Sequence, residues 1–301
     1  MKRVVILGGG TGQSTLLRGL KEFPIDISAV VSVCDDGRST GRLREEFNIF
    51  AVGDIRKVIV SLSETEPLFE ELLNYRFETT SDLNGHTVGN LLLTALSNIT
   101  GNMQEGIETI GKVLPFTLES PTLIGQMEDD SIIKGEHNIS ESHLKIKKVF
   151  YENEVAVNPN VLKAIEEADL IILSMGSLYT SIIPDLLSKK LVRTLDKSKA
   201  KIMYVCNMMT QPGETDDFKV SDHVKVLNSY LGKKKISVVI ANNGEIPKEV
   251  LKKYETEEQK DQVELDEENL KDIRTITRNY VTIENETIRH KVNKLSVDIY
   301  N

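Results

Sequence analysis

A glycine-rich segment near the start of the chain could bind phosphate. It reads GGGTGQST over residues 8–15 and joins an apolar run to a helix-like stretch. Glycines let backbone N–H groups approach a ligand closely, and the N-terminus of the following helix carries partial positive charge. A tight strand-to-helix turn without a ligand is the alternative interpretation. The residues expected to contact an anionic ligand are Gly9, Gly10, Thr11 and Gly12.

The same segment differs from two common nucleotide-binding patterns. No lysine precedes Ser14, as a Walker A loop would require, and Gln13 stands where the dinucleotide pattern G-x-G-x-x-G has its last glycine. We therefore expect no NAD, and a nicotinamide-dependent oxidoreductase is disfavoured.

A second segment combines acids and arginines, reading DDGRSTGRLR over residues 35–44. Two carboxylates followed by three arginines can coordinate a hydrated cation and clamp a phosphate, which predicts a diphosphate with Mg²⁺. A surface loop whose charges pair with one another is the alternative. The expected ligand-binding residues here are Asp36, Arg38, Ser39 and Arg42.

Further polar segments follow apolar runs or precede helical ones, at residues 53–56, 85–90, 174–181, 207–215 and 242–244. Taken singly, His86 or Asp54 would usually be a structural residue, and only convergence with the other segments makes it a candidate. No Ser-His-Asp arrangement is legible, and the hydroxyl-rich segment 174–181 lacks the G-x-S-x-G pattern of a hydrolase nucleophile elbow, which argues against a hydrolase site there. The additional candidates are His86, Asn90, Gly176, Ser177, Thr180, Asn207, Thr210, Gln211, Gly213 and Glu214.

Five apolar runs position these segments. Each ends abruptly in a small or polar residue and is followed by a helix-like stretch, a pattern typical of an α/β fold with a Rossmann-like, doubly wound, mainly parallel sheet. In such a sheet the loops at the carboxyl ends of the strands converge on one site. The runs span residues 4–7, 29–34, 170–173, 202–206 and 236–241.

Two stretches interrupt this alternation within one domain of residues 1–301. Short strand-like runs predict a small antiparallel insertion at about residues 116–152. The segment from about 254 to 301 is expected to pack back on the end of the sheet, and its acidic part, residues 255–268, to be a solvated loop and helix face.

Composition excludes several classes of protein. The chain is 40% hydrophobic and carries a net charge of −9, which disfavours nucleic acid as a partner. No apolar run approaches the roughly 20 residues that span a bilayer, so no membrane insertion is expected. The two cysteines lie far apart and the five histidines lack zinc-site spacing. We expect a cytoplasmic protein and a homo-oligomer, most simply a dimer.

The motifs resemble those of the gluconeogenesis factor (YvcK) family. GGGTGQST, DDGRSTGRLR, GDIR, GHTVGN, GSLYTSIIP and NMMTQPGET occur in this order between residues 4 and 243. This family is similar to the CofD enzymes, 2-phospho-L-lactate transferases that use a guanylyl-activated donor and magnesium. Ser174 and Met175 depart from the Gly-Pro usual before Gly176 in the family.

The resemblance implies a Rossmann-like fold and a site for a nucleotide-sugar such as UDP-N-acetylglucosamine. It also implies a role in cell shape and envelope maintenance during gluconeogenic growth. By position, Asp54 matches the metal-binding aspartate of the transferases and is a possible Mg²⁺ ligand. Tyr254 and Arg289 fall where contacts to the UDP-sugar are expected.

Two functions from different classes follow. The first is a nucleotide-sugar-binding regulator, favoured because no residues form an evident acid–base pair. The second is a magnesium-dependent transferase of a phosphate-linked group, in which Asp54 with Asp35 or Asp36 holds the metal.

Overall fold

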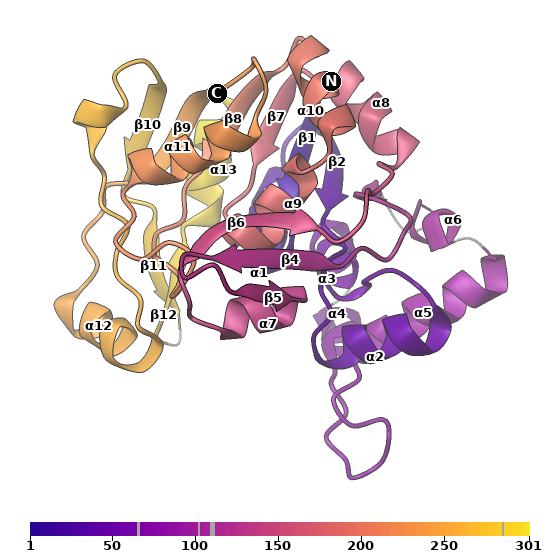
Figure 1. Cartoon of the computed structure of the whole chain (residues 1–301). Coiled ribbons are helices and arrows are strands. Elements are labelled where there is room, and N and C mark those ends of the chain that lie inside the picture. The colour runs from indigo at the N-terminus through magenta and orange to yellow at the C-terminus, as the bar shows by residue number, and fades with distance from the viewer. Residues whose placement is uncertain (65–66, 102, 109–111, 285) are drawn as a thin grey trace.

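The structure is a computed structural model that describes residues 1–301 except 65–66, 102, 109–111 and 285 (Figure 1). For Arg38, Met103 and Glu108 the structure describes the backbone and not the side chain.

A seven-stranded sheet, parallel at every pairing, forms the centre of the molecule. Its order is β10-β9-β8-β7-β1-β2-β3. The chain fills one side of β1 first, with β2 and β3, and then crosses to β7 on the other side, so the order reverses between β1 and β7. The strands are β1 Lys2–Gly8, β2 Ile25–Val31, β3 Val113–Pro115, β7 Leu170–Leu173, β8 Lys201–Val205, β9 Ile236–Asn242 and β10 Arg274–Arg278.

The sheet confirms the predicted α/β, Rossmann-like class, with differences in detail. All five predicted strands are present, but the second covers residues 25–31 instead of 29–34. It ends early because the chain then leaves the sheet, where Arg44 donates to the carbonyl oxygens of Cys34 (3.0 Å) and Asp35 (2.8 Å). The edge strands β3 and β10 were not predicted, since β3 has three residues and β10 contains one apolar residue, Ile276, among polar ones.

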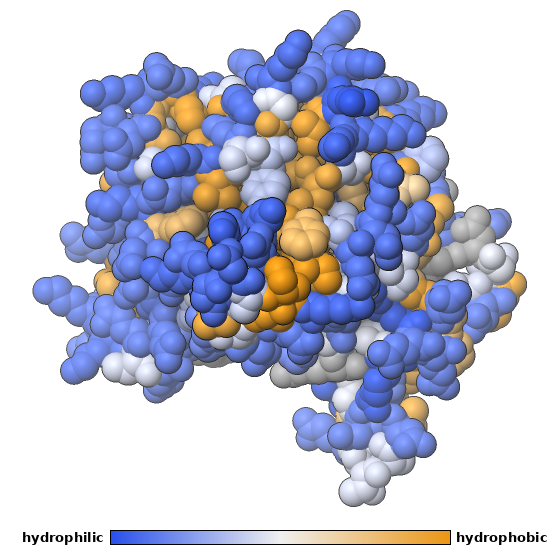
Figure 2. All heavy atoms as spheres, in the orientation of Figure 1, coloured by the Kyte–Doolittle hydropathy of each residue, from blue (hydrophilic) through white to orange (hydrophobic). Residues whose placement is uncertain are grey.

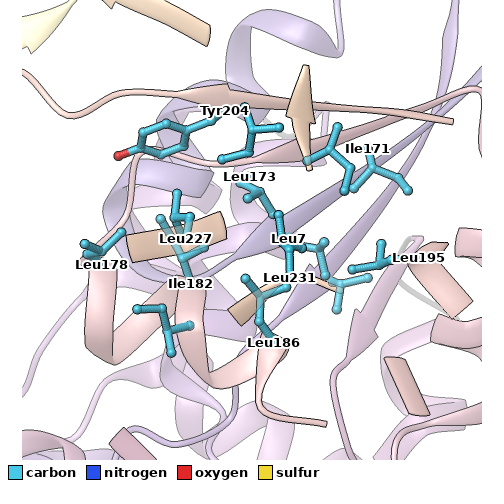
Figure 3. Close-up of a cluster of buried hydrophobic side chains, with 14 of the residues drawn as sticks. Leu7, Ile171, Leu173, Leu178, Ile182, Leu186, Leu195, Tyr204, Leu227 and Leu231 are labelled. Carbon is cyan, nitrogen blue, oxygen red and sulfur yellow. The ribbon is translucent and has the colours of Figure 1, made fainter. Parts of the chain in front are cut away.

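Helices cover both faces of the sheet, because alternate residues of each buried strand point to opposite sides. Val4 and Ile6 of β1 pack in one core with α1, α3 and α13, whereas Val5 and Leu7 pack in another with α8 to α11. Figure 3 shows part of the second core, in which Leu7, Ile171 and Leu173 meet helix residues such as Leu186.

The helices before the insertion are α1 Gly10–Leu20, α2 Arg38–Phe47, α3 Gly53–Leu62, α4 Pro67–Asn74, α5 Val88–Thr100 and α6 Met103–Glu108. Those after it are α8 Pro159–Glu167, the π-helix η1 Leu178–Ile182, α9 Ile183–Leu186, α10 Lys189–Lys197, α11 Val220–Tyr230, α12 Lys248–Lys253 and α13 Val292–Tyr300. Among the described residues, no helix is long and apolar enough to cross a membrane.

The antiparallel insertion is confirmed. Strands β4 Leu123–Met127, β5 Ile132–Lys134 and β6 Ile146–Tyr151 pair antiparallel in the order β5-β4-β6. A short helix, α7 Glu136–Glu141, which was not predicted, joins β5 to β6. In Figure 1 this small sheet crosses the front of the molecule.

The C-terminal segment contributes to three parts of the fold. It begins with the π-helix η2 Tyr254–Glu258 and the 3₁₀ helix η3 Glu267–Asn269, and then adds β10 to the edge of the main sheet. Strands β11 Val281–Glu284 and β12 Thr287–His290 form a hairpin. Helix α13 then packs beside α1, with Leu295 in the core.

Candidate functional site

The loops after β1 and β7 leave the sheet side by side at the point where the strand order reverses. This is where open α/β sheets bind ligands. The loops approach each other so closely that a Cβ added at Gly12 would overlap the carbonyl oxygen of Met175. One at Gly176 would lie 3.3 Å from the carbonyl oxygen of Gly9.

The glycine loop has the geometry of an anion site. Gly8 (φ 149°) and Gly10 (φ 64°) adopt conformations that favour glycine, and α1 begins at Gly10 with no side-chain cap. The uncapped N–H groups of the first turn are therefore open to a ligand. Gln13 is fully buried and donates to the carbonyl oxygens of Ile6 (2.9 Å) and Val30 (2.8 Å), so it joins β1 to β2 where the dinucleotide pattern has glycine.

Asp54 lies directly beside this loop, in the first turn of α3. Its Oδ1 accepts a hydrogen bond from Lys57 Nζ at 2.9 Å, and its Oδ2 would be 2.9 Å from a Cβ added at Gly9. Asp35 accepts a hydrogen bond from the Gly37 amide at 3.0 Å. Burial raises the pKa of Asp35, and the charge of Asp54 raises it further.

A third carboxyl group, Glu136, comes from α7 of the insertion. Burial raises its pKa to about 8, the charges of Asp35 and Asp54 act in the same direction, and a hydrogen bond from Ser140 (3.1 Å) opposes the shift. The three acids line a cavity of about 270 Å³, and Lys57 is the cationic side chain among its described lining residues. The cavity is lined by Gly10, Ser32, Asp35, Asp54, Lys57, Glu136, Ser140, Ser177, Thr180, Ser181 and Gln211.

A second cavity, of about 560 Å³, continues on the other side of the glycine loop. The two share Gly10, Ser177, Ser181 and Gln211, and together they form what we call the cleft. The second cavity is lined by residues 9–12, 175–177, 181, 207–211, 254, 258, 260 and 287–290.

Tyr254 and Arg289 both line the second cavity. The Tyr254 hydroxyl accepts a hydrogen bond from the Ile288 amide at 2.9 Å, so Tyr254 holds the β11–β12 hairpin against η2. Arg289 is exposed on this hairpin. Burial lowers the pKa of neighbouring His290 to about 4, so this side chain is neutral at pH 7.

Glu214 and Asn207 tie the loops of the cleft together. Glu214 accepts hydrogen bonds from Ser177 Oγ (2.5 Å), the Tyr179 amide (3.0 Å) and Thr180 Oγ1 (3.3 Å), and burial raises its pKa. Asn207 donates to the Gly176 carbonyl oxygen at 2.9 Å. Glu214 lines neither cavity, so its role is to position the loop that carries Ser177 and Thr180.

Several predicted site residues lie outside the cleft, in a buried network. Ser39 Oγ and His86 Nδ1 are 2.9 Å apart, Asn90 donates to Ser39 Oγ (3.2 Å), and Arg56 donates to Asn90 Oδ1 (3.0 Å). Burial lowers the pKa of His86, as does the charge of Arg42. These side chains satisfy one another and support α2, α3 and α5.

Of the other predicted residues, Asp36, Arg42 and Gly213 have partners outside the cleft, whereas Thr210 lines it. Asp36 accepts a hydrogen bond from the His137 amide at 2.9 Å, and Arg42 donates to the carbonyl oxygens of Asp82 and Asn84. Gly213 (φ 77°) packs against the backbone of His143. Thr210 lines the second cavity, and the Arg38 side chain lies outside the described residues.

Mg²⁺ fits the site as part of a complex with phosphate. Among the described residues, no group of three or more His, Cys, Asp or Glu side chains could hold a metal ion. Mg²⁺, however, usually binds one or two carboxylates together with substrate phosphates and waters. Asp54 and Asp35, which both line the smaller cavity, would supply these carboxylates.

Comparison with known proteins assigns the family. A family model described as 2-phospho-L-lactate transferase CofD matches residues 4–281. The chain is 45% identical over 304 residues to the gluconeogenesis factor of Bacillus subtilis (strain 168), covering 98% of this chain and 96% of the relative. It is 45% identical over 276 residues to the putative gluconeogenesis factor of Thermotoga maritima, covering 89% and 87%.

A solved structure agrees with this assignment. The crystal structure of protein BH3568 from Bacillus halodurans superposes with a TM-score of 0.95 at 42% identity, covering 100% of this chain and 99% of the other. The chain therefore belongs to the CofD family and, within it, to the gluconeogenesis factors, as the sequence motifs predict.

Proposed function

We propose that the protein binds a nucleotide-sugar of the UDP-N-acetylglucosamine type in the cleft and acts as a regulator. The observation that carries this proposal is the meeting of the uncapped glycine loop with Asp54, Lys57 and the residue 175–177 loop where the strand order reverses. Such a site would offer a diphosphate backbone N–H groups, the Lys57 ammonium group and, through Asp54 and Asp35, carboxylates for Mg²⁺.

The parts of the ligand would bind to different residues. The backbone of Gly10 to Gly12 would bind the phosphates, and Asp54 and Asp35 would hold the Mg²⁺ that neutralises their charge. Asn207, Gln211, Tyr254 and Arg289 would surround the nucleoside in the larger cavity. His290, neutral beside Arg289, adds no charge there.

The biological setting rests on the family. Its members' name, gluconeogenesis factor, and the resemblance described above support a cytoplasmic role in cell shape and envelope growth on gluconeogenic carbon sources.

We also propose a homodimer. Helix α4 exposes Leu68 (76%) and Leu72 (48%), which offers an apolar contact surface, and light scattering would test the assembly.

Calorimetry tests the binding proposal. UDP-N-acetylglucosamine, GDP and NAD are titrated into the protein with and without Mg²⁺. We expect micromolar binding of the UDP-sugar, dependent on Mg²⁺, and no binding of NAD. No heat and no thermal shift with the UDP-sugar at millimolar concentration would refute the proposal.

A magnesium-dependent transferase is the second candidate, supported by the family description and by the paired carboxylates of Asp35 and Asp54. In that case Asp54→Asn should leave donor binding nearly intact while abolishing transfer, because the metal then acts chiefly on charge that develops in the transition state. Chromatography of reactions with nucleotide donors and candidate acceptors would detect the product. Product that disappears in the Asp54→Asn protein would establish an enzyme.

A further inference from the structure

The smaller cavity of the cleft has features that a phosphate site does not need. We infer that it is a subsite for a neutral sugar ring, in which Ser32 and Glu136 recognise sugar hydroxyl groups. This inference rests on the proposed binding of a nucleotide-sugar and names the residues that would distinguish the sugar from its nucleotide.

Ser32 provides the first observation. Its side chain is 4% exposed and lines the cavity, and among the described residues its Oγ makes no hydrogen bond of normal geometry, although it interacts with the Cys34 thiol. The backbone amide of Ser32 donates to the Gly8 carbonyl oxygen at 2.9 Å, which fixes the residue beside the glycine loop. A thiol is a weak hydrogen-bonding partner, so this buried hydroxyl is poorly satisfied, and a ligand hydroxyl that bonds to it would be favoured.

The chemistry and size of the cavity lining provide the second observation. Asp35 and Asp54 would bind Mg²⁺ together with the diphosphate, and the remaining lining that the structure describes is mainly Glu136, Lys57 and a set of hydroxyl groups, which suits an uncharged ligand better than a second anion. At about 30 Å³ per water molecule, 270 Å³ corresponds to about nine waters, a volume suited to one sugar ring. Ser140, Ser177, Thr180 and Ser181 add hydroxyl groups, which can both donate to and accept from a polyhydroxylated ligand.

Glu136 is positioned at the cavity by Asp36, which contacts the start of its helix from outside, and by Ser140 within the same helix. Asp36 accepts from the His137 amide at 2.9 Å, and a Cβ added at Gly135 (φ 93°) would lie 2.5 Å from Asp36 Oδ2. Ser140 Oγ donates to Glu136 Oε1 at 3.1 Å. Asp36 therefore fixes the start of α7, and the insertion supplies a recognition residue to the cleft.

The test compares two ligands that differ only in the sugar. Calorimetry with UDP and with UDP-N-acetylglucosamine, both with Mg²⁺, is carried out on the wild type and on Glu136→Ala, Glu136→Gln and Ser32→Ala. We expect the wild type to bind the UDP-sugar more tightly than UDP. Glu136→Ala should weaken binding of the UDP-sugar about tenfold and leave UDP binding unchanged, whereas Glu136→Gln, which keeps hydrogen-bonding groups, should lose less.

Ser32→Ala should also reduce the preference for the UDP-sugar over UDP, by a smaller factor than Glu136→Ala does. Glu141→Ala is the matched control, because Glu141 is exposed at the end of the same helix and does not line the cavity. Equal losses for both ligands in Glu136→Ala, or equal wild-type affinities, would overturn this inference alone. If the wild type bound neither ligand, the proposed function would fail and this inference with it.

Discussion

Asp185 should make the stability of the protein fall as pH rises. This residue of α9 is fully buried, and neither carboxyl oxygen has a hydrogen-bond partner of normal geometry among the described residues. Burial raises its pKa well above the usual value of 3.8, and only the neighbouring Gly8 amide opposes this shift. Asp185→Asn keeps the shape of the protonated side chain but removes its titration.

The magnitude follows from proton linkage. Above the pKa of the unfolded chain, the unfolded state loses the Asp185 proton while the folded state retains it. Stability therefore falls by about 1.4 kcal/mol for each pH unit until the folded pKa is reached. Other groups titrate equally in both proteins, so they cancel in the comparison. Over each pH unit in which the folded state keeps this proton and the unfolded state does not, the wild type should lose about 1.4 kcal/mol relative to Asp185→Asn.

Urea unfolding followed by circular dichroism measures this difference. The free energies of unfolding of both proteins are determined at pH 5.0, 5.5 and 6.0, and the slopes of stability against pH are compared. An infrared carbonyl band from a protonated carboxyl group, present in the wild type and reduced in Asp185→Asn, would identify the group directly. Parallel stability profiles for the two proteins would refute the conclusion that Asp185 is buried in its neutral form.

Three other substitutions test the cleft. Gly12→Ala should destabilise the protein by about 1–3 kcal/mol and abolish ligand binding, because the new Cβ would force the glycine loop away from Met175. Thermal unfolding measures the loss of stability and calorimetry the loss of binding. Unchanged binding would contradict the described loop packing. Asp54→Asn should weaken UDP-sugar binding about tenfold, or about 1.4 kcal/mol, only when Mg²⁺ is present. An equal loss without Mg²⁺ would argue against a metal at Asp54. Tyr254→Phe should lower the free energy of unfolding by about 1–3 kcal/mol, since the Ile288 amide loses its hydrogen-bond acceptor. Hydrogen exchange at that amide should accelerate. Unchanged exchange would show that this hydrogen bond is unimportant.

The position of the cleft could be predicted from the sequence because strand patterns and polar strand ends are local features. The apolar runs that end at Gly8 and Ser174 place two loops at the same edge of a parallel sheet, and the structure brings Gly12 and Met175 into direct contact there. The antiparallel insertion was predictable for the same reason, since its three strands alternate with turn residues.

The partners of individual side chains could not be predicted in this way. His86 and Asn90 come from a segment that resembles a ligand-binding loop, but they point into a buried network with Ser39. Glu136 carries no local signal, since its place in the cleft depends on how the insertion folds over the main sheet. Ser32 was missed because the strand was expected to continue to residue 34, which would have placed this side chain within the sheet.

The most direct test of the central claim is a crystal structure of the protein with UDP-N-acetylglucosamine and Mg²⁺. We predict the diphosphate at the backbone of residues 9–12, the metal ion against Asp54, and the sugar ring in the cavity lined by Ser32 and Glu136. Ligand density elsewhere, for example in the groove of about 1470 Å³ beside Asn242 and Gly244, would contradict the account.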